Sequence, residues 1–234
     1  MKDSAERNPK KIRNRLTDLF FAPFCCSCGD RAADSTLPFC KDCIKDFQVS
    51  LVKECPECGC KRSGCSCEKS SNTVFLFYYH TKGEKRIILN LKQNPDKRTA
   101  RFLGKLLAEK VKREKSVGFD CVTYVPRSPK NVRIHGGDQS KLIAAGVAEG
   151  LEIPLKPLLA RREKRASDQK LLDAVERRKN VKNTFFPAKE AADYRRVLLV
   201  DDVTTTGSTI DECADILREA GVKQVVKAVL ARTP

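Results

Sequence analysis

The sequence predicts an α/β protein in which helices flank a parallel β-sheet and a small Cys-rich, zinc-binding module precedes it. From residue 73 onwards, apolar strand-like runs alternate with helix-like segments, as in βαβ folds. Ten of the twelve cysteines lie between Cys25 and Cys67, in a region with few large aliphatic residues. We therefore expect a basic N-terminal extension (1–24), a Cys-rich module (25–72) and an α/β domain (73–234).

Composition and charge narrow the class of protein. The 234-residue chain is 41% hydrophobic with a formal net charge of +16, and no apolar run approaches the roughly 18 residues of a membrane span. The charged N-terminus lacks the apolar segment of a secretory signal, so we expect a cytoplasmic protein without membrane insertion. Basic residues outnumber acidic ones by twelve to four over 80–115 and by ten to four over 156–182. These stretches indicate either solvated helix faces or a polyanionic partner such as nucleic acid.

Apolar periodicity predicts the elements of the α/β domain. The expected strands are residues 74–79, 121–125, 197–200 and 224–231. The expected helices are residues 84–92, 98–115, 140–149 and 209–220. Gly150 and Gly221 are typical of helix ends. The last strand, helix and strand form a βαβ unit, which predicts a right-handed crossover between parallel strands.

The first group of cysteines indicates a structural metal site. Cys25 and Cys28 form one CxxC pair, and Cys40 and Cys43 form another. Four thiolates make a closed tetrahedral Zn²⁺ site with no open position for catalysis. The alternative is a chance cluster of reduced cysteines.

A second group of cysteines follows at a tighter spacing. Cys55 and Cys58 form a CxxC pair, and Cys65 and Cys67 form a CxC pair. This arrangement predicts a second Zn²⁺ ion, for which Cys60 is an alternative ligand. The module therefore holds one or two structural zinc ions, which supply folding energy to a region that cannot build its own core.

The segment VLLVDDVTTTGST, residues 197–209, carries the clearest chemical signal. Its apolar start predicts a buried parallel strand, and ligands of open α/β sheets bind at the carboxyl ends of such strands. Small and hydroxyl-bearing residues then open a helix, where backbone N–H groups and the helix dipole favour a phosphate. Asp201 and Asp202 precede this loop and suit the vicinal hydroxyls of a sugar. The string indicates a sugar phosphate, and the alternative is a simple helix N-cap.

This string closely resembles the ribose-phosphate signature of type I phosphoribosyltransferases. The resemblance implies that Asp201 and Asp202, the candidate catalytic residues, contact the 2′ and 3′ hydroxyls of phosphoribosyl pyrophosphate (PRPP). It implies a type I phosphoribosyltransferase-like sheet, with Mg²⁺ accompanying the pyrophosphate. It also implies that the 5′-phosphate is bound by the loop residues Thr204, Thr205, Thr206, Gly207, Ser208 and Thr209.

From Cys25 onwards the chain resembles the ComF family of competence-associated proteins. The matching features are the CxxCG…CxxC…CPxCG module and the segments HTKGEKRIILNLKQ, YVPRSPKNVRIHGGDQS and REKRASDQKLLDAVERRKNVKNTF. The second segment departs from the family pattern, because residues 136–139 read GGDQ instead of Gly-Phe-Asn-Gln and an Arg pair is replaced by Ile134 and His135. The remaining candidates for binding pyrophosphate are Arg127, Ser128 and Lys130.

The ComF resemblance implies a role in handling single-stranded DNA during natural transformation. The implied ligand is PRPP or a nucleotide, and the implied partners are competence proteins such as a DNA-uptake helicase. No segment spells out a base-recognition pocket. The alternatives are therefore an active phosphoribosyltransferase of nucleotide metabolism with an unidentified acceptor, and a regulatory pocket that senses PRPP or a nucleotide.

Overall fold

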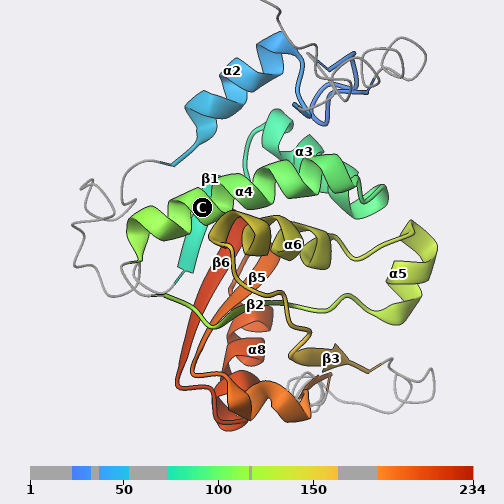
Figure 1. The fold of residues 1–234 in the computed structure, drawn as a ribbon. Helices are drawn as coiled ribbons and strands as arrows, with labels where there is room; N and C mark the ends of the chain where they lie inside the picture. Colours follow the sequence, from blue (N-terminus) through green and yellow to red (C-terminus); the bar gives the residue numbers. More distant parts are fainter. Residues whose placement is uncertain (1–22, 33–36, 53–72, 116–117, 163–183, 234) are drawn as a thin grey trace, which may run out of the picture.

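The computed structural model describes residues 23–32, 37–52, 73–115, 118–162 and 184–233. Its main sheet has four strands, and every neighbouring pair is parallel (Figure 1). In spatial order the strands are β1 (Thr73–Tyr78), β6 (Gln224–Arg232), β5 (Arg196–Thr204) and β2 (Cys121–Tyr124). The parallel sheet confirms the predicted α/β class.

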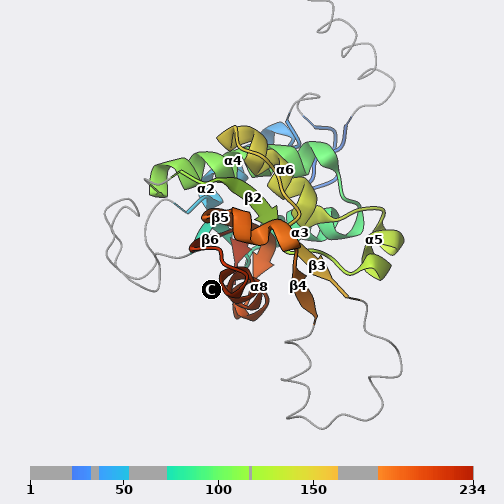
Figure 2. The same cartoon turned by 60° about the horizontal axis from the view of Figure 1, so that its bottom comes forward.

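Helices cover both faces of this sheet (Figures 1 and 2). One face carries α3 (Lys82–Gln93), α4 (Lys97–Glu114) and α6 (Gln139–Leu151), and the other carries α8 (Ser208–Glu219). Strand residues alternate between two apolar clusters, as the period of a β-strand requires. Leu198 and Val200 of β5 join the cluster with α4 and α6, whereas Val197 and Leu199 join the one with α8. Among the described helices, none has the length and apolar composition of a membrane span.

The Cys-rich module packs against the α/β domain and shares its core. Its helix α2 (Lys41–Ser50) buries Phe47 against Phe39, with ring centroids 4.8 Å apart, and against Phe77 of β1 at 5.6 Å. Val52 N–H then donates to the Leu76 carbonyl at 2.8 Å, so the end of the module pairs with the edge of β1. A small Cys-rich region thereby obtains the apolar contacts that it cannot supply alone.

The expected domain limits fall largely on residues that the structure does not describe. Residues 1–22 and 53–72 lie outside the described ranges. The division into 1–24, 25–72 and 73–234 therefore remains a prediction.

Several short elements were not expected from the sequence. Ser128 caps a helix, α5 (Pro129–His135), and Pro129 occupies its first turn, where a missing N–H costs nothing. An antiparallel pair, β3 (Leu159–Arg161) with β4 (Phe185–Pro187), lies beside the main sheet (Figure 2). A 3₁₀ turn, η3 (Lys189–Asp193), leads into β5. These segments are too short to show a clear periodicity.

Two element boundaries differ from expectation for physical reasons. Strand β5 does not end at Val200 but runs to Thr204, because Asp201, Val203 and Thr204 stay in register with β6. Helix α6 does not end at Gly150 but continues to Leu151. A Cβ at Gly150 would lie 2.7 Å from the Ala108 Cβ of α4, so this glycine permits close helix packing.

Glycines also set the closest approach of α4 and α6, and this contact is testable. A Cβ at Gly104 would collide with the Ile143 carbonyl and lie 2.9 Å from the Gly146 Cα. Because these atoms are backbone, Gly104→Ala must push the helices apart. We expect a loss of about 1–3 kcal/mol in the free energy of unfolding, despite the better helix propensity of alanine. Urea denaturation measures it, with Gly118→Ala as the control, since nothing lies within 4 Å of a Cβ there. Equal stability of the two variants would contradict this packing.

Candidate functional site

The two aspartates lie at the carboxyl end of β5, against the first turn of α6. The Ser140 hydroxyl donates to Asp201 Oδ1 at 2.8 Å. The Gln139 side-chain amide donates to Asp202 Oδ2 at 3.1 Å. Asp138 accepts from the Lys141 N–H at 3.1 Å and so caps α6, which fixes the two donors at the start of the helix.

The two carboxylates are not equivalent. Asp202 is only 5% exposed; its Oδ1 accepts from the Val203 N–H at 2.7 Å, and Lys92 Nζ lies 3.5 Å from its Oδ2. Asp201 is half-buried, and both of its hydrogen bonds, from Ser140 and from the Asp202 N–H, fall on Oδ1. Asp201 is thus the acid with an oxygen to offer to a ligand.

The environment of Asp201 makes its protonation sensitive to pH near neutrality. Burial raises the pKa of this carboxyl to about 8, and the charge of neighbouring Asp202 acts in the same direction. The Ser140 hydrogen bond and the positive charge of Lys92 oppose that rise. Two adjacent carboxylates in a site of low polarity do not both ionise readily.

The loop after β5 presents small polar residues at the start of α8. Gly207 adopts a left-handed conformation, with φ of 85°, immediately before the helix. The Thr206 hydroxyl donates to the Ser208 hydroxyl at 3.1 Å, and Thr205, Thr206, Ser208 and Thr209 are all exposed. Thr204 differs, because it is 8% exposed and paired with β6. The exposed hydroxyls and the N-terminus of α8 suit an anion.

An ion pair that the sequence did not reveal lies next to this loop. Asp211, in the first turn of α8, is close enough to Gly207 that a Cβ there would lie 2.9 Å from its Oδ2. Lys227 of β6 pairs with the other oxygen of Asp211. The lysine offsets an acidic charge that would otherwise weaken an anion site.

The three pyrophosphate candidates in the segment after β2 have different environments. The Arg127 guanidinium donates to the Lys92 carbonyl at 3.0 Å, and the Arg127 N–H donates to Asp138 at 2.9 Å. The Ser128 hydroxyl accepts from the Asn131 N–H at 3.3 Å and caps α5. Lys130 is exposed on α5. Of the three, Arg127 is linked by these contacts to the surroundings of the acid pair.

Sequence reasoning did not single out Lys92, Gln139 or Ser140, which contact the acid pair. All three lie in segments that carry the ComF resemblance, at the ends of NLKQ and GGDQS. The ComF resemblance of these segments was the only indication in the sequence that the three residues have a role. The apolar periodicity of either segment does not indicate contact with a strand about 60 residues or more away.

The first cysteine group forms a compact cluster. The Sγ atoms of Cys25, Cys28, Cys40 and Cys43 all lie within 4.8 Å of one another, and the Sγ atoms of Cys28 and Cys40 are 3.7 Å apart. Tetrahedral zinc with Zn–S bonds of about 2.3 Å requires sulfur atoms roughly 3.8 Å apart. Backbone N–H groups of Ser27 and Cys43 point at Sγ atoms of the cluster at 3.4 Å. The cluster can hold a metal ion such as zinc.

The second cysteine group cannot be placed in the same way. Cys55, Cys58, Cys65 and Cys67 lie outside the described residues, as does Cys60. A second zinc ion therefore remains a prediction.

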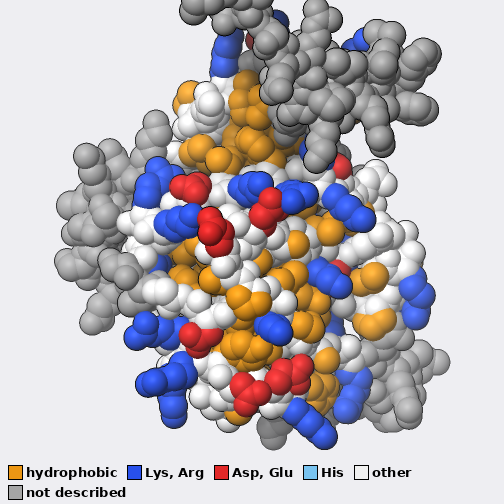
Figure 3. Space-filling model, in the orientation of Figure 1, with side chains coloured by type: hydrophobic (Ala, Val, Ile, Leu, Met, Phe, Trp, Pro, Cys, Tyr) orange, Lys and Arg blue, Asp and Glu red, His pale blue; other side chains and the backbone are white. Residues whose placement is uncertain are grey.

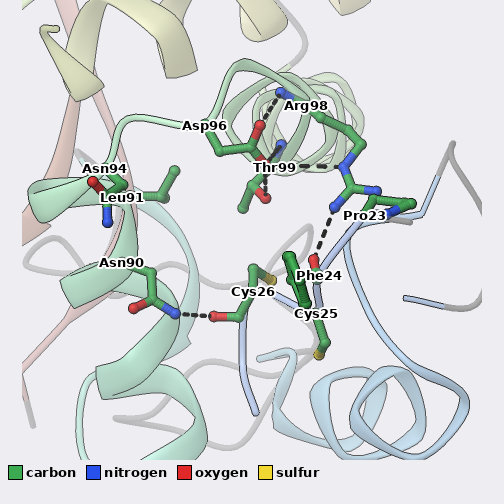
Figure 4. A pocket seen from close by; sticks show the side chains of 10 residues that line it. All are labelled: Pro23, Phe24, Cys25, Cys26, Asn90, Leu91, Asn94, Asp96, Arg98 and Thr99. Carbon is green, nitrogen blue, oxygen red and sulfur yellow. Dashed lines mark hydrogen bonds and ion pairs between the residues drawn. The ribbon is translucent and has the colours of Figure 1, made fainter. Parts of the chain in front are cut away.

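Side chains of α3 and α4 hold the cluster in place. The Asn90 amide donates to the Cys26 carbonyl at 2.7 Å, and an Arg98 guanidinium nitrogen donates to the Phe24 carbonyl at 2.9 Å. Figure 4 shows both residues reaching across a cavity of about 500 Å³ between the module and the two helices. The backbone of the metal-binding turn is thus tied to the same helix, α3, that carries Lys92.

Comparison with known proteins finds relatives that share these features. A model described as a phosphoribosyl transferase domain matches residues 139–234, which include Gln139, the acid pair and the loop. Competence protein F of Haemophilus influenzae is 41% identical over 99 residues, 42% of this chain and 43% of that protein. Competence protein ComFC of Streptococcus pneumoniae is 27% identical over 213 residues, 86% of this chain and 90% of that protein. The chain is thus similar to competence proteins of the ComF type, and its C-terminal part matches a phosphoribosyl transferase domain.

Other similar proteins match part of this chain. DNA utilization protein YhgH of Escherichia coli is 30% identical over 131 residues, 55% of this chain and 57% of that protein. The matches to the H. influenzae and E. coli proteins thus span roughly half of their lengths. A solved glutamine PRPP amidotransferase from B. subtilis is 27% identical, with a TM-score of 0.41 over 56% of this chain and 25% of that one. A purine phosphoribosyltransferase from Pyrococcus horikoshii is 23% identical, with a TM-score of 0.37 over 58% of this chain and 74% of that one.

The cysteine cluster leads to a test of metal content. We expect Cys40→Ser to lower the zinc bound per folded molecule by one equivalent, because three thiolates hold the ion far less tightly. Cys26→Ser should retain the metal, since Cys26 lies beside Cys25 in the chain but not in the cluster. Elemental analysis of the purified variants measures the difference. Equal loss of zinc from both variants would exclude this ligand set.

Proposed function

We propose that this protein acts as a member of the ComF family and binds a ribose 5-phosphate ligand, either PRPP or a nucleotide, at the carboxyl end of β5. One observation carries the proposal: a half-buried carboxylate, Asp201, is followed within one short loop by exposed hydroxyls at the N-terminus of α8. A carboxylate accepts hydrogen bonds from sugar hydroxyls, and a helix N-terminus favours a phosphate. A ribose 5-phosphate carries both groups.

The two acids and the loop have separate roles in this proposal. Asp201 accepts hydrogen bonds from the ribose diol, whereas Asp202 is held by Gln139 and Lys92 and fixes the end of the strand. Residues 205–209 bind the 5′-phosphate, and buried Thr204 supports the loop from within β5. Mg²⁺ would offset the charge of a pyrophosphate group. Oxygen atoms of PRPP itself would coordinate this Mg²⁺ ion, because both carboxylate oxygens of Asp202 already accept hydrogen bonds.

The proposed cellular role is the handling of single-stranded DNA in the cytoplasm during natural transformation. The names of two relatives refer to competence and that of a third to DNA utilization. DNA and competence proteins, such as a DNA-uptake helicase, are the partners that this role implies. Single-stranded DNA binding requires a basic surface that follows the backbone.

The distribution of ion pairs supports one location for such a surface. Figure 3 shows acidic side chains interspersed with basic ones over α4. Arg101 and Lys105 both pair with Glu149, so this acid offsets part of the positive charge of the basic stretch. Four exposed cations without an ion pair among the described residues lie on α3 and at the start of α4: Lys82, Lys85, Arg86 and Lys97. We propose these residues as the DNA contacts.

An active phosphoribosyltransferase with an unidentified acceptor is the alternative proposal. The same acid pair and phosphate loop would hold PRPP for transfer as well as for binding. PRPP-dependent release of pyrophosphate across a panel of bases would distinguish turnover from binding alone.

The raised pKa of Asp201 leads to a pH-dependent prediction. The folded carboxyl is largely protonated at pH 7 and ionises as the pH rises to 9, and the ionised form accepts hydrogen bonds from the diol more strongly. We therefore expect the affinity for ribose 5-phosphate, measured by calorimetry, to increase by at most about tenfold over this range. The phosphate is already doubly charged there.

Two controls isolate the carboxyl. Asp201→Asn should remove the pH dependence, while Asp193→Asn, an exposed acid on η3, should retain it. Inorganic phosphate has no diol, so its affinity should not change between pH 7 and 9. An affinity for ribose 5-phosphate that falls with pH would contradict the assigned role of Asp201.

The proposed DNA surface can be tested by charge removal. Substituting Lys85, Arg86 and Lys97 together by glutamine should weaken binding to a single-stranded oligonucleotide. It should also reduce the slope of log affinity against log salt by about two units, at roughly 0.7 per phosphate contact. The control removes three exposed charges elsewhere: Lys189, Arg195 and Lys223. If both triple variants bind with the wild-type salt slope, the DNA contacts lie elsewhere.

A further inference from the structure

We infer that Lys92 binds the second anionic group of the ligand, the pyrophosphate of PRPP or an equivalent phosphate. The inference rests on the proposed ribose 5-phosphate site. Lys92 lies outside both segments from which phosphate-binding residues were expected, the loop after β5 and the segment after β2.

Helix α3 brings Lys92 to the acid pair. The residue lies in the last turn of the helix, and its ammonium is 3.5 Å from Asp202 Oδ2. Its carbonyl accepts a hydrogen bond from the Arg127 guanidinium at 3.0 Å. Arg127, itself a candidate for binding pyrophosphate, therefore contacts the backbone of the turn that brings Lys92 to the carboxyl end of β5, where the ribose is proposed to bind.

The backbone of Lys92 is fixed while its side chain keeps some freedom. The buried side chains of Ile87, Ile88 and Leu91 hold α3 against the core. Asn90 anchors the same turn to the Cys26 carbonyl. The Lys92 side chain is still 42% exposed. A lysine with a fixed stem and an accessible ammonium is suited to meeting an incoming anion.

The contact with Asp202 is loose enough to exchange. Asp202 already accepts hydrogen bonds from Gln139 and Val203, so its burial does not depend on Lys92 alone. At 3.5 Å, the ammonium forms an ion pair longer than a normal charged hydrogen bond. A pyrophosphate offers more charge and more acceptor oxygens than one carboxylate. We therefore expect the ammonium to turn from Asp202 to the ligand.

A purely structural role makes a different prediction. If Lys92 only balances the charge of Asp202, its removal disturbs the acid pair and weakens every ribose ligand equally. If Lys92 contacts pyrophosphate, its removal weakens PRPP and spares ribose 5-phosphate. The ratio of the two affinities separates these roles.

The experiment is calorimetric titration of the full chain with Mg²⁺-PRPP and with ribose 5-phosphate. We expect Lys92→Gln to lower the affinity for PRPP by about tenfold or more, the effect of losing a hydrogen bond to a charged group. The affinity for ribose 5-phosphate should change by less than about threefold on the same scale. Lys92→Arg, which keeps the charge, should restore most of the PRPP affinity.

The control is Lys223→Gln, since Lys223 is exposed and directly precedes the amino end of β6, at the sheet edge opposite the acid pair. It should leave both affinities unchanged. If Lys92→Gln fails to fold by circular dichroism, Lys92→Met, which keeps the alkyl stem, replaces it in the test.

Three results would overturn the inference. They are an equal loss for both ligands, no loss for PRPP, and a wild-type protein that binds PRPP no more tightly than ribose 5-phosphate. A wild-type protein that binds neither ligand would instead overturn the proposed function on which the inference rests.

Discussion

The arrangement of this protein depends on keeping two adjacent carboxylates at the buried end of a parallel strand. Asp201 and Asp202 follow four apolar residues of β5, and the strand continues past them in register with β6. Charged groups in such a place need donors. The structure supplies a serine hydroxyl, a glutamine amide, a lysine ammonium and two backbone N–H groups. The first turn of α6 and the last turn of α3 are thereby fixed around the site.

Helix α3 connects the Cys-rich module to this acid pair. On one side Asn90 holds the Cys26 carbonyl, next to the metal-binding turn, and on the other side Lys92 reaches Asp202. The two residues are neighbours on one turn of helix, and a rigid helix transmits displacement over so short a distance. A metal ion bound by the cluster would stabilise the module that Asn90 ties to α3, the helix that positions Lys92 beside the acid pair.

The charge of the molecule is less uniform than its net value of +16 suggests. Arg101 and Lys105 of α4 are paired with Glu149 of α6, and Lys227 is paired with Asp211 beside the loop that follows β5. The remaining exposed cations of α3 and the start of α4 lie on elements that also flank the Cys-rich module. The net charge alone does not locate a surface that could bind a polyanion, because neighbouring acids cancel part of the positive potential of the cations.

The sequence by itself determined the features that depend on local order. The CxxC spacing predicted the four clustered cysteines, apolar runs predicted the parallel strands, and the string at 197–209 predicted an acid pair beside a helix N-terminus. Only the tertiary structure decided that Asp202 is held through both of its oxygens, whereas the hydrogen bonds of Asp201 fall on one oxygen. That difference arises because Lys92, Gln139 and Ser140 come from elements about 60 residues or more away along the chain, and local periodicity carries no record of such contacts.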